Sequence, residues 1–272
     1  MSLGDFLIFP IVLCFVAAVA ATAAHGPVSR KRVDRFARRQ RLDVTATNGD
    51  QIIRYLATTR RWRATGFAAG YVLLITAGYL LHQIGNLGVA VLFAGWFTGT
   101  LVAEIRVVHL AHGTRRAASL RPRRPRFYLS GVAWALVPVA AGIAVVVAAG
   151  TAAAAALHRA DPDWWAAVWL FVALATAGTV RAVQRLVLRR PQPLAAPDVL
   201  AADDAIRSRS LHVLAGGGTA LVLLCVTAQL DAIHPTAGDN VEVWRGIGLV
   251  LAVLLGGKVA TTPWPAPRPD AQ

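Results

Sequence analysis

The chain has 272 residues, of which 56% are apolar and only 15% are charged, and its mean hydropathy is +0.52. A soluble domain carries about 25% charged residues. The composition excludes a disordered chain, which needs low hydrophobicity and abundant charge. Two cysteines exclude a disulfide-rich scaffold and a cysteine-based zinc module. Because the apolar residues form long runs, we predict an all-α, polytopic transmembrane bundle that forms one integral membrane domain over residues 1–272.

Seven segments are long and apolar enough to be membrane spans, since a spanning helix needs about 20 mostly apolar residues. They cover residues 6–24, 64–81, 87–103, 128–157, 164–180, 211–230 and 241–261. Segment 6–24 also has features of a secretory signal peptide, with Ala21-Thr22-Ala23 as a cleavage site. We interpret it as a retained span, because no basic residue precedes it and seven follow within positions 30–41.

The basic residues predict the orientation of the bundle. The net charge is +14, and 26 of the 28 lysines and arginines fall in loops 25–63, 104–127 and 181–210 or near the C-terminus. Cytoplasmic loops are enriched in these residues, so we expect the N-terminus outside, the C-terminus inside and a location in the cell membrane. A pI near 11.4 is also typical of proteins that bind nucleic acid. However, no base-reading motif is present, and anionic inner-leaflet lipids are the simpler partner.

The uncharged part of the last expected span, 241–261, is shorter than the hydrocarbon core is thick. Only 12 uncharged residues separate Arg245 from Lys258, which is about 18 Å of helix against about 30 Å of hydrocarbon. One explanation is that these side chains reach toward the interfaces. Glu242, one turn before Arg245, and Glu104, at the inner end of span three, are candidate ion-pair partners, the latter for Lys258. A functional charge site is the third possibility.

A short motif occurs twice, 153 residues apart. Each copy is an Asp-x-x-Ile-Arg sequence in a basic loop before a two-span hairpin, and the copies are Asp50, Ile53, Arg54 and Asp203, Ile206, Arg207. It suggests a parallel repeat of three spans, a connecting span and three spans, as in some transporters. Coincidence is the competing interpretation, since the match is short.

Two loop segments have the pattern of interfacial helices. In 29–42, Val33, Phe36 and Ala37 form an apolar strip on a strongly basic helix, and 48–63 has a similar strip. Both suit the inner leaflet surface. Docking of a cytoplasmic partner is the alternative. Within the spans, glycines four residues apart predict close helix contacts, and these are Gly66 with Gly70 and Gly95 with Gly99.

Motifs for enzymatic chemistry are scarce. His109 and His112 share a helix face at the inner edge, which is compatible with a metal ion, but no cysteine or carboxylate cluster completes such a site. Solvated interfacial histidines are the simpler interpretation. The chain has neither a Gly-x-x-x-x-Gly-Lys nor a Gly-x-Ser-x-Gly sequence. We expect no cofactor.

Three functional hypotheses follow. The first is a non-enzymatic, permease-like or scaffold subunit that works with a cytoplasmic ATPase or regulator. The second is an enzyme that acts on lipid headgroups with Glu104, His109 and His112, where arginines hold the phosphate. The third is an autonomous channel or carrier for small solutes, lined by polar side chains within or near the spans, which are Gln83, Asn86, Thr98 and Gln229.

Overall fold

A computed structural model describes residues 18, 21–22, 24–81, 87–110, 116–117, 124–157, 160–162, 164–193, 196–231, 233–235 and 240–262. The expected first span, 6–24, therefore lies almost entirely outside the described residues. The described residues form seven α-helices and one 3-10 turn, η1 (Pro125–Phe127). The α-helices are α2 (Arg30–Gln40), α3 (Gly49–Leu81), α4 (Leu87–Leu110), α5 (Gly131–Ala156), α6 (Trp165–Arg189), α7 (Pro197–Asp231) and α8 (Asn240–Thr261). The prediction of an all-helical fold is confirmed.

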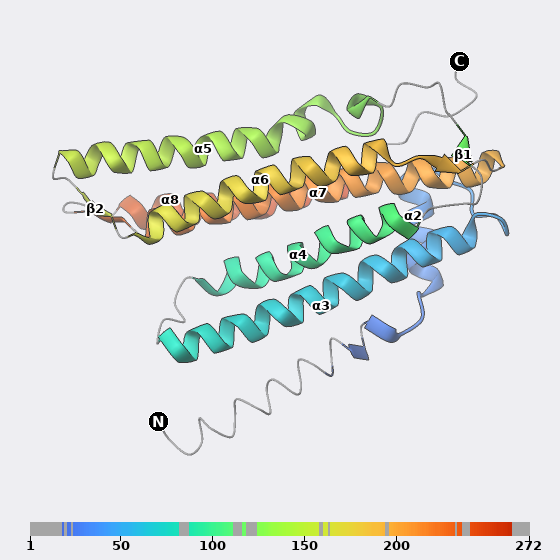
Figure 1. Cartoon of the computed structure of the whole chain (residues 1–272), viewed down its shortest axis with the longest axis horizontal. Helices are drawn as coiled ribbons and strands as arrows, with labels where there is room; N and C mark the ends of the chain where they lie inside the picture. Colours follow the sequence, from blue (N-terminus) through green and yellow to red (C-terminus); the bar gives the residue numbers. More distant parts are fainter. Residues whose placement is uncertain are drawn as a thin grey trace.

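Helices α3 to α8 run alternately up and down, side by side (Figure 1). At one end α3, α5 and α7 begin, α4, α6 and α8 end, and α2 lies across the helix termini (Figure 1). We call this the basic end. Two small antiparallel pairings join the connections: β1 (Arg116–Ala117) with β3 (Gln192–Pro193) at the basic end, and β2 (Ala160–Pro162) with β4 (Ile233–Pro235) at the opposite end.

Two helices are longer than the spans expected within them. The segments 48–63 and 64–81, which the sequence suggested as a loop helix and a span, form the single 33-residue helix α3. Helix α7 has 35 residues and includes both a loop segment and the expected span 211–230. Each is about 50 Å long, more than the roughly 30 Å of a hydrocarbon core. The first turns of both helices therefore form part of the basic end.

The predicted glycine contacts join α3 to α4. A methyl group on Gly66 would lie 2.7 Å from the Gly99 Cα, and one on Gly95 would lie 2.6 Å from the Gly70 Cα. Such distances are too short for any side chain, so the two backbones touch directly. Helices α7 and α8 meet in the same way, since a methyl group on Gly256 would lie 2.8 Å from the Gly216 carbonyl oxygen.

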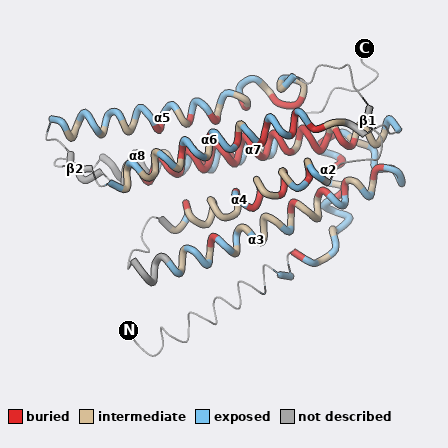
Figure 2. The backbone as a smooth tube through the Cα atoms, viewed as in Figure 1, coloured by how far each residue is buried: buried red, intermediate tan, exposed pale blue. Residues whose placement is uncertain are grey.

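Four helices of the described chain are long and apolar enough to cross a membrane: Gly88–His109, Gly131–Ala156, Trp165–Arg189 and Pro197–Leu230. The apolar part of α8, Gly246–Thr261, is shorter. Helix α7 lies in the middle of the bundle and is buried along almost its whole described length (Figure 2). The outer faces of α5, α6 and α8 expose large apolar side chains, among them Val132, Val146, Phe171 and Val253. Apolar surface of this extent is typical of helices that contact lipid.

Candidate functional site

Helix α2 packs against the basic end through its apolar strip. Val33 and Phe36 are buried with Ile52 and Tyr55 of α3 and with Ile206 of α7. The rings of Phe36 and Tyr55 lie 6.1 Å apart. This confirms that α2 is amphipathic, but its apolar strip contacts protein. Its arginines must then lie at the sides of the helix and on its outer face.

The connection between α2 and α3 is attached to the start of α7. The hydroxyls of Thr45 and Thr47 both donate to the Asp198 carboxylate, and the Thr45 bond is 2.6 Å long. The buried Asn48 donates to the Asp43 carbonyl oxygen at 2.9 Å and accepts from the Thr45 amide at 2.9 Å. These bonds hold α2 in place over α3 and α7.

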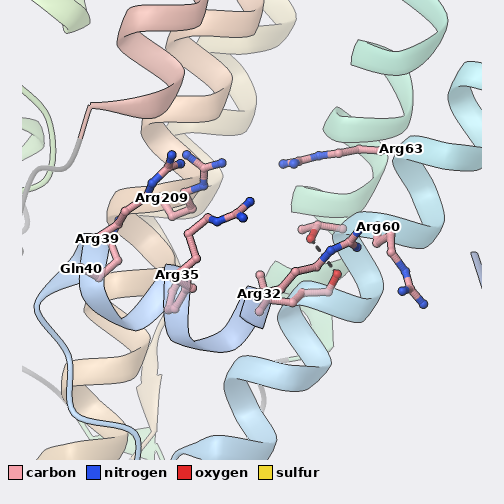
Figure 3. A pocket seen from close by; sticks show the side chains of 10 residues that line it. Arg32, Arg35, Arg39, Gln40, Arg60, Arg63 and Arg209 are labelled. Atoms are coloured by element: carbon pink, nitrogen blue, oxygen red, sulfur yellow. Dashed lines mark hydrogen bonds between the residues drawn. The ribbon is translucent and has the colours of Figure 1, made fainter. Parts of the chain in front are cut away.

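A cavity of about 320 Å³ lies where α2, α3 and α7 meet. Its wall includes six arginines together with a few polar and apolar side chains, and the ten lining residues are Arg32, Arg35, Phe36, Arg39, Gln40, Leu56, Thr59, Arg60, Arg63 and Arg209. As far as the described residues form it, the wall contains no carboxylate. Figure 3 shows Arg35, Arg39 and Arg209 on one side and Arg63 extending toward them from the other. We call this space the arginine cavity.

Several polar atoms of the arginine cavity have no hydrogen-bond partner among the described residues. The unpartnered atoms are the Nε atoms of Arg60 and Arg63 and the Oε1 atom of Gln40, a side chain that is only 8% exposed. Buried donors without partners cost free energy, and guanidinium groups that converge repel one another. A bound anion offsets the positive charge of the arginines that line the cavity.

Glu104 on α4 lies behind one wall of the cavity. Its carboxylate is fully buried and accepts hydrogen bonds from the hydroxyls of Ser210 and Tyr55, the latter at 3.4 Å. The Arg63 Nη2 atom lies 3.9 Å from the Glu104 Oε1 atom. Burial and the Glu104 charge raise the pKa of the Tyr55 phenol well above its usual range, so this hydroxyl stays a donor. Arg63 is therefore shared between Glu104 and the arginine cavity.

A second buried cluster joins α7 to the end of α6. Arg207, with no exposed surface, donates to the carbonyl oxygens of Val187, Leu188 and Arg190 at 3.0–3.2 Å. The Val187 and Leu188 carbonyls belong to the last turn of α6, and Arg190 follows its last residue, so none of the three has a partner within the helix. Arg207 also pairs with Asp203 at 2.9 Å, and Asp203 pairs with Arg190. Burial, and then the charge of Arg207, lower the pKa of Arg190 to about 10, which leaves it charged at neutral pH.

The two copies of the Asp-x-x-Ile-Arg motif have different surroundings. Asp203, Ile206 and Arg207 are buried within α7. The first copy is exposed in the first turns of α3, and its residues are Asp50, Ile53 and Arg54. Asp203 is the seventh residue of its helix and Asp50 the second, which explains the difference. The second copy connects helices inside the bundle, whereas the first faces outward.

The structure corrects the predicted partner of Glu104. Its ion pair is with Arg63 and not with Lys258, whose side chain is exposed on α8. The reason is that α3 packs against α4 at this level through the glycine contacts, whereas Lys258 lies on a helix that packs on α7.

Other predicted residues are separated from this site or cannot be placed. His109 is exposed at the end of α4, and its Nδ1 atom lies 2.7 Å from the Ile105 carbonyl oxygen. His112 lies outside the described residues. Glu242 and Arg245 belong to the first turns of α8, but their side chains lie outside the described part. Of the residues proposed to line a pore, Thr98 is exposed on α4, Gln229 is buried in α7, and Gln83 and Asn86 lie outside the described residues.

No family model, curated protein or solved structure matches this chain.

The arginine cavity was not predicted as a site, although part of its signal is present in the sequence. Arg32, Arg35 and Arg39 have the i, i+3, i+7 spacing of one helix face, and Arg60 and Arg63 are one turn apart. What the sequence does not show is that Arg209, about 150 residues away, completes the set.

Proposed function

We propose that this chain is a non-enzymatic integral membrane component that holds a phosphate-bearing anion in the arginine cavity. The observation that carries the proposal is the cavity itself, which is lined by six arginines and, as far as the structure describes its wall, by no carboxylate. Arginine suits phosphate because its planar donors bind two oxygens at once. The volume of about 320 Å³ is at the lower end of small-ligand sites.

Binding is favoured over catalysis by the positions of the proposed catalytic residues. Glu104 is completely buried inside the bundle, whereas His109, five residues later on the same helix, is exposed. Five residues correspond to about 140° around an α-helix, so the two side chains leave α4 in different directions. An enzyme of lipid headgroups that uses them together is therefore the weaker candidate.

The membrane topology belongs to the same proposal. We propose seven spans in the cell membrane, with the N-terminus outside, the C-terminus inside and the basic end in the cytoplasm. The positive charge of the loops supports this orientation. A 3+1+3 repeat remains part of the proposal, since α3 with α4 and α7 with α8 are both antiparallel pairs in glycine contact. The orientation can be tested by adding a membrane-impermeant thiol reagent to intact cells that carry the Arg124→Cys variant. Because residue 124 is proposed to lie in the cytoplasm, we expect no labelling.

A cytoplasmic partner protein is a separate proposal. Arg30, Lys31 and Arg38 are exposed on α2 and do not line the arginine cavity. They suit an acidic surface of an ATPase or regulator, as the sequence suggested for a permease-like or scaffold subunit. Purification in a mild detergent tests this proposal, because it predicts a stoichiometric partner that is lost from an Arg30→Ala/Arg38→Ala variant.

Calorimetric titration of the purified full-length protein with inorganic phosphate tests the anion site. We expect the double variant R35A/R39A to bind at least about tenfold more weakly, since each charge-assisted hydrogen bond contributes about 1.5–3 kcal/mol. The matched control is R30A/R38A, which removes the same charge from the same helix without touching the cavity wall. If both double variants bound phosphate equally weakly, the loss would come from net charge alone, and the proposed site would be overturned.

A further inference from the structure

We infer that the anion held in the arginine cavity is the phosphate headgroup of a phospholipid with an exposed phosphomonoester, such as phosphatidic acid. This inference rests on the proposed function and names its ligand class. It follows from three features of the cavity: its depth along α3, the composition of its wall, and the helix face that continues beyond it.

The depth of the cavity matches a headgroup layer. Arg60 and Arg63 line it from α3, and the apolar segment 64–81 begins at the next residue. The guanidinium groups therefore lie at the boundary between charged and apolar parts of the helix. In the proposed topology this boundary is the inner-leaflet interface, where basic pockets bind anionic headgroups.

The wall combines positive charge with apolar surface. Phe36 and Leu56 line the same cavity as the six arginines. A free phosphate ion gains nothing from contact with this apolar surface. The glycerol and the first acyl carbons of a lipid bury it, and this burial stabilises the complex. A phosphomonoester carries about −1.5 to −2 charges at neutral pH and three terminal oxygens. It therefore suits a cluster of arginines better than a phosphodiester with a single negative charge.

The helix face beyond the cavity continues as apolar surface. Phe67 follows Arg63 by four residues, which places both on one face of α3. Its side chain is exposed. An acyl chain that leaves the cavity along this face contacts Phe67 first. An exposed aromatic side chain thus lies one turn beyond the cavity, on the face of α3 that carries Arg63.

Native mass spectrometry and thermal-shift titration of the full-length protein in detergent test this inference with three water-soluble probes. They are dihexanoyl phosphatidic acid, glycerol 3-phosphate as its headgroup without chains, and dihexanoyl phosphatidylcholine. We expect phosphatidic acid to bind at least about tenfold more tightly than glycerol 3-phosphate, because burial of a few methylene groups has this effect. Phosphatidylcholine should bind weakly, since its headgroup carries a cation next to its phosphate.

Variants separate the two parts of the site. R35A/R39A should weaken both phosphate probes at least about tenfold, while R30A/R38A should leave them within about threefold of the parent. Phe67→Asn should weaken phosphatidic acid alone. Equal affinity for phosphatidic acid and glycerol 3-phosphate would overturn the lipid as ligand and leave the anion site intact. Equal affinity for phosphatidylcholine would show that the headgroup is not recognised. Failure of both phosphate probes would overturn the proposed function as well.

Discussion

Glu104 and Arg63 form an ion pair of 3.9 Å across the α3–α4 contact, directly behind the arginine cavity. In the proposed function, Arg63 then has two competing anions, the Glu104 carboxylate and a phosphate in the cavity. Because Glu104 is buried and also accepts hydrogen bonds from Ser210 and Tyr55, it stays in place when the cavity is filled. Its charge therefore opposes the binding of any anion to Arg63.

Replacement of Glu104 by glutamine should strengthen phosphate binding. The substitution removes a negative charge next to Arg63, and Tyr55 or Ser210 can reverse its hydroxyl to accept from the new amide. We expect a roughly three- to tenfold lower dissociation constant, which corresponds to about 1 kcal/mol. Calorimetric titration with inorganic phosphate measures it. Asp34→Asn is the control, because Asp34 lies on α2 but does not line the cavity. An equal gain in this control would show that only the net charge matters.

Removal of Arg207 should destabilise the whole bundle. Its loss leaves the carbonyl oxygens at the end of α6 without donors and removes one of the two cations that pair with the buried Asp203. Removal of one partner from a buried ion pair costs about 3–5 kcal/mol. For Arg207→Met we expect a fall in Tm of about 10 °C in detergent. Arg54→Met, the equivalent change in the exposed copy of the motif, should change Tm by less than about 2 °C. If both variants lowered Tm equally, the buried network of Arg207, Asp203 and Arg190 would not stabilise the bundle as we expect.

Alanine substitutions of two glycines should affect stability differently, because one glycine lies in a backbone contact and the other faces open space. A methyl group at Gly99 would collide with the Trp62 carbonyl group and lie 3.1 Å from the Gly66 Cα. Because backbone atoms cannot move aside, Gly99→Ala should destabilise the protein by about 1–3 kcal/mol. Gly142 on α5 has no atom within 4 Å of the same position, so Gly142→Ala should be neutral or stabilising by up to about 1 kcal/mol. Thermal unfolding of both variants measures the difference. A stable Gly99→Ala variant would show that α3 and α4 are not in direct backbone contact.

The attachment of the α2–α3 connection to α7 can be tested by hydrogen exchange. Asp198→Ala removes the acceptor of Thr45 and Thr47, so we expect faster amide exchange across residues 41–48. Phosphate binding should weaken by about threefold, because α2 then holds Arg35 and Arg39 less firmly in position. Asp50→Ala, at an exposed carboxylate in the first turn of α3, is the comparison. Unchanged exchange in Asp198→Ala would mean that the packing of Phe36 alone positions α2.

Hydrophobic runs and short residue patterns by themselves determine the helical character of this protein. Long apolar segments can only be helices in a membrane, because every backbone group must find a partner within the chain. The helical class, the amphipathic α2 and the two glycine stripes, Gly66 with Gly70 and Gly95 with Gly99, follow from patterns of a few neighbouring residues. Such patterns can be read locally, since helix faces repeat every three to four residues.

The tertiary structure decided which distant residues meet. Glu104 pairs with Arg63 instead of Lys258 because the glycines bring α3 against α4, and no spacing in the sequence reveals that choice. The two copies of one motif differ in burial because Asp203 lies inside a packed helix and Asp50 at an exposed helix start. The arginine cavity needs α2, α3 and α7 together, and Arg209 reaches it only because α7 passes through the centre of the bundle. Contacts between helices depend on packing in three dimensions, which the order of residues along one helix does not contain.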